Sequence, residues 1–156
     1  MNPTAAKSLS ALALRATLHC LAGCAIGEVL GMVLGTALGL SNGATVALSI
    51  ALAFVSGFGL TVWPLLGAGL GLKRSLALAF ASDAASITVM EIVDNALMLV
   101  IPGAMDAPHS SGLFWGSLLF SLLVSGAAAF PLNRWLIARG QGHAKVHALH
   151  HGHAHH

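Results

Sequence analysis

The chain has 156 residues, of which 56% are hydrophobic and 8% are charged, and its mean hydropathy is +0.84. A water-soluble domain carries charge on about a quarter of its residues, so this composition excludes a soluble globular protein. The net charge of +2 and the lack of a basic patch interleaved with aromatic residues give no reason to expect a nucleic-acid partner.

The apolar stretches predict an all-α integral membrane protein with four transmembrane helices, because one span needs about 20 apolar residues. The first predicted span covers residues 15–40 and ends at the turn-forming tripeptide 41–43. The later spans cover 44–72, 75–101 and 112–137, so that residues 15–139 form the transmembrane domain, 1–14 a cytoplasmic N-terminal segment and 140–156 a His-rich cytoplasmic tail.

The N-terminal sequence also resembles a signal peptide, with Lys7 and Arg15 ahead of small residues near Cys20. However, the apolar run continues to Leu40, whereas the hydrophobic region of a signal peptide is only about 7–15 residues long. The run is therefore interpreted as the first span.

The distribution of basic residues predicts the orientation of the spans. With a cytoplasmic N-terminus, every Lys and Arg falls on the cytoplasmic side: Lys7, Arg15, Lys73, Arg74, Arg134, Arg139 and Lys145. This segregation follows the positive-inside rule and predicts a bacterial cytoplasmic (inner) membrane protein with both termini in the cytoplasm. Trp63 and Trp135 then lie at the inner interface and Trp115 near the outer one, as in an aromatic belt.

Small residues recur at four-residue spacing in two of the spans. The first span has a row of five glycines: Gly23, Gly27, Gly31, Gly35 and Gly39. Such a row favours close helix packing, and because four spans are thin for an enclosed pathway, we expect it to join copies of the chain in a homo-oligomer. Ser117, Ser121 and Ser125 form a second row, which is interpreted as packing.

A weak internal repeat is visible at an offset of 67 residues. It aligns TVWPLL with AAFPLN, and it places Cys24 over Glu91 and Glu28 over Asn95. Two parallel-repeat hairpins, each with a polar first helix, would explain this pattern.

Four of the five acidic residues lie inside predicted spans: Glu28, Asp83, Glu91 and Asp94. Each opposes insertion by roughly 2.5–3.5 kcal/mol at a helix centre, and no Lys or Arg within the spans offsets them. Unpaired carboxylates in lipid must be protonated, hydrated or bound to a cation.

These acids and several sulfur and nitrogen ligands predict a polar track along the first and third spans. Cys20, Cys24 and Glu28 share one helical face, with His19 beside it. The candidate metal or ion pathway comprises His19, Cys20, Cys24, Glu28, Asp83, Met90, Glu91, Asp94, Asn95 and Met98. Matching depths predicts that Cys24, Glu28, Asp83 and Glu91 form one site.

The mixed ligand set leaves the cargo open. Thiolate, imidazole and thioether groups suit copper or zinc, whereas carboxylate and amide groups suit harder ions or protons. The two cysteines lie side by side at i and i+4, a poor geometry for a disulfide, so reduced thiols are expected. The alternatives are that the thiols fill apolar space, that His19 is an interfacial histidine, and that the acids hydrogen-bond between helices.

The C-terminal tail holds seven of the nine histidines: His143, His147, His150, His151, His153, His155 and His156. Their irregular spacing favours a native metal-binding extension over a purification tag, although a tag remnant or a solvated tail is also compatible. His109, in the predicted outer loop, has no identifiable partner in the sequence.

Three segments carry a resemblance to a known family: LHCLAGCAIGEVLGMVLGTALG, ITVMEIVDNALMLVIPGAMDA and AFPLNRWLIARG. Through them the chain resembles, over nearly its whole length, the domain-of-unknown-function 4396 family of small bacterial membrane proteins. The resemblance implies a four-helix inner-membrane protein that often ends in a His-containing tail. It implies no established activity.

Three functions compete on these observations. The leading one is a transporter, channel or binding protein for a transition-metal cation such as copper or zinc. The second is a membrane-embedded metal-dependent or thiol redox enzyme, although no nucleophile–base, nucleotide-loop or haem-attachment motif is recognised. The third is a non-catalytic accessory subunit whose polar residues only hold the helices together.

Overall fold

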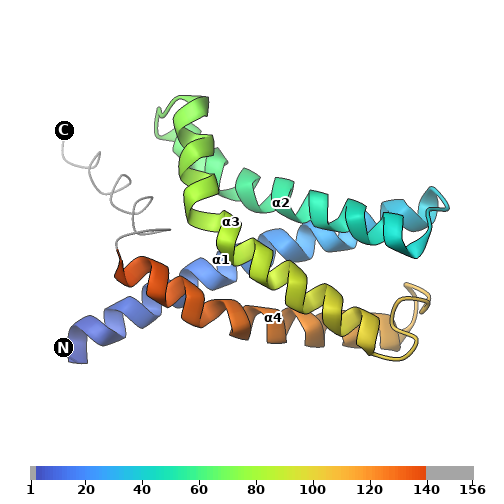
Figure 1. The fold of residues 1–156 in the computed structure, drawn as a ribbon. Coiled ribbons are helices and arrows are strands. Elements are labelled where there is room, and N and C mark those ends of the chain that lie inside the picture. Colours follow the sequence, from blue (N-terminus) through green and yellow to red (C-terminus); the bar gives the residue numbers. More distant parts are fainter. Residues whose placement is uncertain (1–2, 140–156) are drawn as a thin grey trace.

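The computed structural model describes residues 3–139, which form four helices (Figure 1). These are α1 (Pro3–Ala37), α2 (Asn42–Gly67), α3 (Leu72–Val100) and α4 (Gly112–Ala138), and the described part contains no strand. Each helix is long and apolar enough to cross a membrane. The predicted all-α fold with four membrane-spanning helices is therefore confirmed.

The bundle carries its apolar side chains outside and much of its polarity inside. Large apolar residues such as Leu18, Phe80 and Leu123 are more than half exposed. By contrast, fourteen polar or charged residues of the described chain are buried, including four of its acidic residues. Such a surface would aggregate in water but is stable against lipid tails, so the helices lie in a bilayer.

The helices differ from the predicted spans mainly at the N-terminus, where α1 begins at Pro3 rather than near residue 15. Residues 3–14 are rich in alanine and leucine and lack an internal breaker, so the helix continues beyond the apolar core. At the other boundaries, Gly39 and Gly69 take positive φ angles of 64° and 82° and so end α1 and α2. The Ser41 and Ser111 side chains cap α2 and α4.

The glycine row of α1 packs against α2 of the same chain. A Cβ atom on Gly23, Gly27 or Gly31 would collide with the α2 backbone, at Gly57, Ala53 and Ser49 respectively. The row therefore makes the close helix contact that its spacing predicts. The expectation that it joins two copies of the chain is wrong, because α2 already covers it.

The α2 side of this contact is a matching row of small residues. Thr45, Ser49, Ala53 and Gly57 recur every fourth residue and face Gly35, Gly31, Gly27 and Gly23 in turn. Gly39, the last of the predicted row, lies beyond the contact, because a Cβ atom added there would meet nothing within 4 Å. The two rows run antiparallel, and they set the register of the α1–α2 hairpin.

The two ends of the bundle differ in charge. Figure 1 shows both ends of the described chain and the α2–α3 turn at one end, and the α1–α2 and α3–α4 loops at the other. We call the first the basic end, because it carries Lys7, Arg15, Lys73, Arg74, Arg134 and Arg139. The opposite end, which we call the vestibule end, has no Lys or Arg in its loops, 38–41 and 101–111.

The register of the second hairpin agrees with the predicted repeat. Ser121 of α4 contacts Asp94 of α3. At the 67-residue offset of the repeat, Asp94 corresponds to Gly27 of α1 and Ser121 corresponds to Phe54 of α2. Gly27 packs against Ala53, one residue away. The α1–α2 and α3–α4 hairpins thus pair at nearly the same height, which supports two parallel repeats.

Candidate functional site

Three carboxyl groups meet inside the bundle, in the half nearer the vestibule end. Glu28 comes from α1, and Glu91 and Asp94 come from one face of α3. Glu28 is 1% exposed, Glu91 4% and Asp94 1%. Glu28 interacts electrostatically with both of the others. We call these three residues the acid cluster.

The members of the acid cluster differ in their hydrogen-bond partners. Asp94 accepts a short hydrogen bond of 2.5 Å from the Ser121 hydroxyl, and Glu91 accepts one of 3.3 Å from the Asn95 amide. The Glu28 and Asp94 carboxyl groups lie close enough to share a hydrogen bond, which requires a proton on one of them. Apart from such a shared proton, no donor within residues 3–139 reaches either carboxyl oxygen of Glu28, or Oε1 of Glu91. Three buried acceptor atoms of one cluster therefore lack a donor.

A carboxylate without donors in a low-dielectric interior is too unstable to persist as a bare charge. Three adjacent negative charges would add repulsion to this desolvation penalty. The cluster must therefore hold protons, shared between neighbouring carboxyl groups such as Glu28 and Asp94, or a cation. Either one supplies the positive charge that no basic side chain provides at the acid cluster.

Sulfur atoms adjoin the acid cluster. The Cys24 thiol lies beside the Glu91 carboxyl group. Both Cys20 and Cys24 are reduced, as predicted, and they pack with Met90 against Ala53 and Ile87 in an apolar cluster. Met90 therefore belongs to this packing, whereas Cys24 touches both the packing and the acids.

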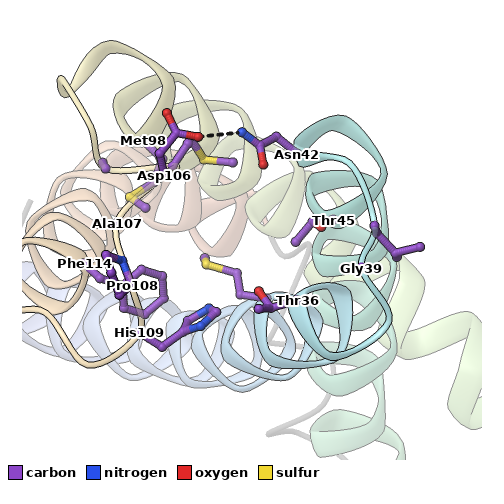
Figure 2. Close-up of a pocket in the computed structure, with 14 residues that line it drawn as sticks. Thr36, Gly39, Asn42, Thr45, Met98, Asp106, Ala107, Pro108, His109 and Phe114 are labelled. Carbon is purple, nitrogen blue, oxygen red and sulfur yellow. Dashed lines mark hydrogen bonds between the residues drawn. The ribbon is translucent and has the colours of Figure 1, made fainter.

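A water-accessible cavity of about 410 Å³ opens at the vestibule end (Figure 2). Its polar and sulfur-bearing lining comes from α1, the start of α2, the end of α3 and the α3–α4 loop, and comprises Met32, Thr36, Asn42, Thr45, Met98, Met105, Asp106 and His109. We call this cavity the vestibule. In Figure 2, Met98 and Asp106 lie across the opening from Thr36 and His109.

The vestibule is ordered by contacts at its rim. The Asn42 amide donates to Asp106 over 3.1 Å and ties the start of α2 to the α3–α4 loop. The His109 ring packs edge-on against Phe114, with centroids 4.6 Å apart, and its backbone carbonyl accepts from the Trp115 indole. A carboxylate and an imidazole are thus held at the mouth of the cavity.

A narrow void lies between the vestibule and Glu28 of the acid cluster. It is lined by Glu28, Ser49 and Asn95, and it shares Met32, Thr45, Met98 and Met105 with the vestibule. Its volume of about 10 Å³ is at the lower limit for one water molecule. Three methionine side chains, those of Met32, Met98 and Met105, therefore line the space between the vestibule and Glu28, and methionine is a flexible side chain.

A second polar network lies nearer the basic end and links three helices. The Thr61 hydroxyl of α2 donates to Asp83 of α3 over 2.5 Å, and its oxygen lies 2.9 Å from His19 Nε2 of α1. Asp83 also accepts from the Ser82 hydroxyl, at 2.7 Å. Since His19 and Thr61 continue the two small-residue rows by one step, the α1–α2 register brings them together.

An asparagine amide makes the third polar link, between α1, α3 and α4. Asn133 donates to the Thr17 hydroxyl at 2.9 Å and to the Ser86 hydroxyl at 3.0 Å. Thr17 in turn donates to the Ala13 carbonyl of its own helix. These side chains are buried and partnered, so this network fastens the bundle.

The structure brings together some of the predicted site residues and separates others. Cys24, Glu28, Glu91, Asp94 and Asn95 gather at one level, and Met98 lies between them and the vestibule. Asp83 is not part of this site. It interacts with Cys20, one helical turn from Cys24, because α1 and α3 are offset by one turn from the predicted depth match.

Several residues that shape the interior were not predicted as site residues. They are Met32, Met105, Asp106 and His109 of the vestibule, and Thr61, Ser121 and Asn133 of the hydrogen-bond networks. The four-residue rows that contain Thr61 and Ser121 were a usable signal. The vestibule had none, because it depends on how the 101–111 loop folds over α1 and α2.

The arrangement leaves the predicted transition-metal centre without a ready-made ligand set. Within residues 3–139, no three His, Cys, Asp or Glu side chains are placed to hold one metal ion. The tail histidines fall outside the described residues, so their predicted role stays a prediction. The Cys, Met, Glu and Asp side chains of the interior are instead spread along the bundle between Cys20 and the vestibule.

The comparisons with known proteins identify the family. A family model described as a domain of unknown function (DUF4396) matches residues 11–142. The chain belongs to this family, as the three sequence segments indicated. Neither a curated protein nor a solved structure matches it.

Proposed function

We propose that the protein moves a cation across the membrane through the interior of its own four-helix bundle. The observation that carries this proposal is Glu28, a fully buried carboxyl group that no hydroxyl, amide or other N–H donor of residues 3–139 reaches and that has two further acids beside it. A residue that only fastened helices would have its hydrogen bonds satisfied. Glu28 instead has the environment of an ion-binding group.

The proposed path begins in the vestibule, where Asp106 and His109 attract and concentrate the cation. It continues past Met32 and Met98 to the acid cluster, and then past Cys24 toward the basic end. Because the methionines close the void beside Glu28, the described conformation is closed between the vestibule and the cluster.

The favoured cargo is a transition metal of the copper or zinc type. Thioether, imidazole and thiol groups recur along the path, and these ligands bind soft and borderline metals better than they bind magnesium or calcium. A cation that enters the acid cluster displaces the protons that neutralise it, so that cation movement is coupled to proton release. The seven tail histidines would bind the same metal on the other side.

The proposed orientation places the basic end in the cytoplasm of a bacterial cell and the vestibule outside. It rests on the positive-inside rule, since the loops at the vestibule end have no Lys or Arg. A periplasm-only reporter fused to the C-terminus should be inactive, and the same reporter inserted in the 101–111 loop should be active. The opposite pattern would reverse the path.

Flux into proteoliposomes tests the function. Purified protein is reconstituted, and Cu(I), Zn(II) and proton movements are measured separately with indicator dyes. Glu28→Gln keeps the side-chain shape and should stop cation movement, whereas Asp106→Asn at the exposed mouth should only weaken it. Equal flux for the parent and Glu28→Gln would contradict the proposal.

An accessory-subunit function is the second candidate, and the networks at the basic end favour it. There, hydrogen bonds among His19, Thr61 and Asp83 link three helices. These contacts are sufficient to explain why Thr61 and Asp83 are buried and why His19 is partly buried. If the whole interior serves only to hold helices, no Glu28 variant changes a flux and each one changes only the unfolding temperature.

A further inference from the structure

A groove on the membrane-facing surface at the basic end contains one arginine among apolar side chains. It lies between the first turns of α1 and the last turns of α4, and its volume is about 350 Å³. It is lined by Leu9, Phe130, Pro131, Arg134, Trp135 and Ala138. Apart from the guanidinium group of Arg134, the lining side chains are apolar or aromatic.

The guanidinium group of Arg134 has an unmet donor. Its Nε atom is inaccessible to solvent and has no acceptor within residues 3–139. An inaccessible N–H without an acceptor destabilises a structure, and the effect is larger for a charged group. In the described conformation neither solvent nor these residues reach Nε, so an acceptor in the groove pairs with it only when the Arg134 side chain turns outward.

The acidic side chains of this protein are all placed elsewhere. Glu28, Glu91 and Asp94 form the acid cluster, Asp83 accepts from Thr61 and Ser82, and Asp106 accepts from Asn42 at the opposite end. The C-terminal tail, which follows directly on α4, contains no Asp or Glu in residues 140–156. An acidic side chain of this chain is thus not the missing acceptor.

An anionic phospholipid has the two properties that the groove requires. Its phosphate oxygens accept the hydrogen bonds of a guanidinium group in charge-assisted geometry. The upper part of one acyl chain fits the apolar lining of this groove, which lies on the outside of the bundle at the basic end. Arg139, whose guanidinium carbon lies 4.1 Å from the centroid of the Trp135 ring, adds a second positive charge at the rim.

We propose that this groove binds an anionic phospholipid, with the phosphate on Arg134 and the upper acyl chain along Leu9, Phe130 and Trp135. The lipid joins the start of α1 to the end of α4, next to the apolar contact of Ala13 and Ala16 with Ile137. This site is independent of the proposed cation path, which runs inside the bundle.

Native mass spectrometry of the full chain tests the site. The detergent-purified protein is titrated with phosphatidylglycerol, phosphatidylcholine or inorganic phosphate. The parent should retain phosphatidylglycerol in preference to the other two. Arg134→Gln should weaken its binding about tenfold, the size expected when one charge-assisted hydrogen bond is lost. The control is Arg74→Gln, which removes a charge at the same end but outside the groove and should leave binding unchanged.

A second variant keeps the proposal falsifiable if Arg134→Gln fails to fold. Ala138→Phe leaves every charge in place and fills the groove, so it should also reduce phosphatidylglycerol binding. Equal retention of phosphatidylglycerol and phosphatidylcholine by the parent would overturn the proposal. So would equal effects of the Arg134 and Arg74 variants, or displacement of the lipid by inorganic phosphate alone.

Discussion

Both halves of the bundle interior contain buried polar side chains, but the two halves differ in how many hydrogen-bond partners these side chains have. Toward the basic end, Thr61 and Asn133 join polar side chains of three helices each, and their donors and acceptors meet at 2.5–3.0 Å. Toward the vestibule end, Glu28 has no donor other than a neighbouring acid, and Glu91 lacks one at Oε1. Two atoms toward the basic end also lack a partner, the Ser75 hydroxyl and Arg134 Nε, but neither belongs to a carboxyl group.

Under the proposed function, this difference distinguishes the polar residues that stabilise the fold from those that bind the cation. A satisfied network contributes to stability and needs no ligand. An unsatisfied acid cluster opposes folding unless protons or a cation fill it. The acid cluster also lies near the vestibule, a cavity that opens to the outside of the bundle.

Removing the charge of Glu28 should have the largest effect on function. Loss of a buried charged ligand costs about 3 kcal/mol or more, which is roughly 100-fold in cation binding. The variant Glu28→Gln should lose cation binding by at least that factor in a titration with the metal. Its unfolding temperature in detergent should not fall, because the new amide donates to the neighbouring acids.

The opposite pattern would remove the distinction between the two halves. If Glu28→Gln binds the cation as the parent does but unfolds earlier, the acid cluster is a structural element like the Thr61 network. Ser121→Ala is the control for this test, since it removes one hydrogen-bond donor to Asp94 but keeps every charge of the acid cluster.

Breaking the three-helix network should lower stability without altering the acid cluster. Thr61→Val keeps the shape of the side chain but removes the hydroxyl that joins His19 and Asp83. The free energy of unfolding should fall by about 1–3 kcal/mol, as expected when buried polar groups lose a partner. Cation affinity at equilibrium should not change, and Thr61→Ser should restore stability. If Thr61→Val instead loses its affinity for the cation, the two halves of the interior act as one functional unit.

Two glycine substitutions compare the α1–α2 contact with open helix surface. Gly27→Ala forces a methyl group into the Ala53 backbone and should destabilise by about 1–3 kcal/mol, as overpacking does. Gly59→Ala meets nothing within 4 Å and should stabilise α2 by up to about 1 kcal/mol, the difference in helix propensity. Equal effects on unfolding in detergent would mean that the contact is loose.

The smallest expected effect concerns the methionines between the vestibule and the cluster. Met98→Leu conserves volume and should cost less than about 1.5 kcal/mol of stability. It should lower Cu(I) flux several-fold relative to Zn(II) flux, because a thioether prefers the softer ion. An unchanged ratio of the two fluxes would show that the sulfur atom only fills space.

The four helices and their polarity were predictable because each depends on local composition. Residues 41–43 and Pro102-Gly103 mark turns, and apolar runs of about 20 residues mark spans. The packing of the glycine row was also predictable, but its partner was not. The spacing of the glycines alone does not reveal which helix faces Gly27. The row from Thr45 to Gly57 identifies α2 as the partner only when α1 and α2 are aligned side by side.

The site was predicted in part, and the limits have a physical origin. Glu28 and Glu91 could be identified because a charge inside a span is conspicuous. Asp83 was assigned to the wrong level, since a one-turn offset between helices is invisible to depth matching. The vestibule was missed because Asp106 and His109 come from a loop whose course is set by contacts with Asn42 and Phe114.

Infrared difference spectroscopy of the reconstituted protein tests the central claim most directly. Protonated carboxyl groups absorb in a region free of other protein bands, and the band disappears when a cation replaces the proton. The account predicts that Cu(I) or Zn(II) removes such a band from the parent, and that Glu28→Gln lacks the part due to Glu28. Replacing the seven tail histidines should leave the change intact. A parent spectrum that does not respond to either cation would contradict the account.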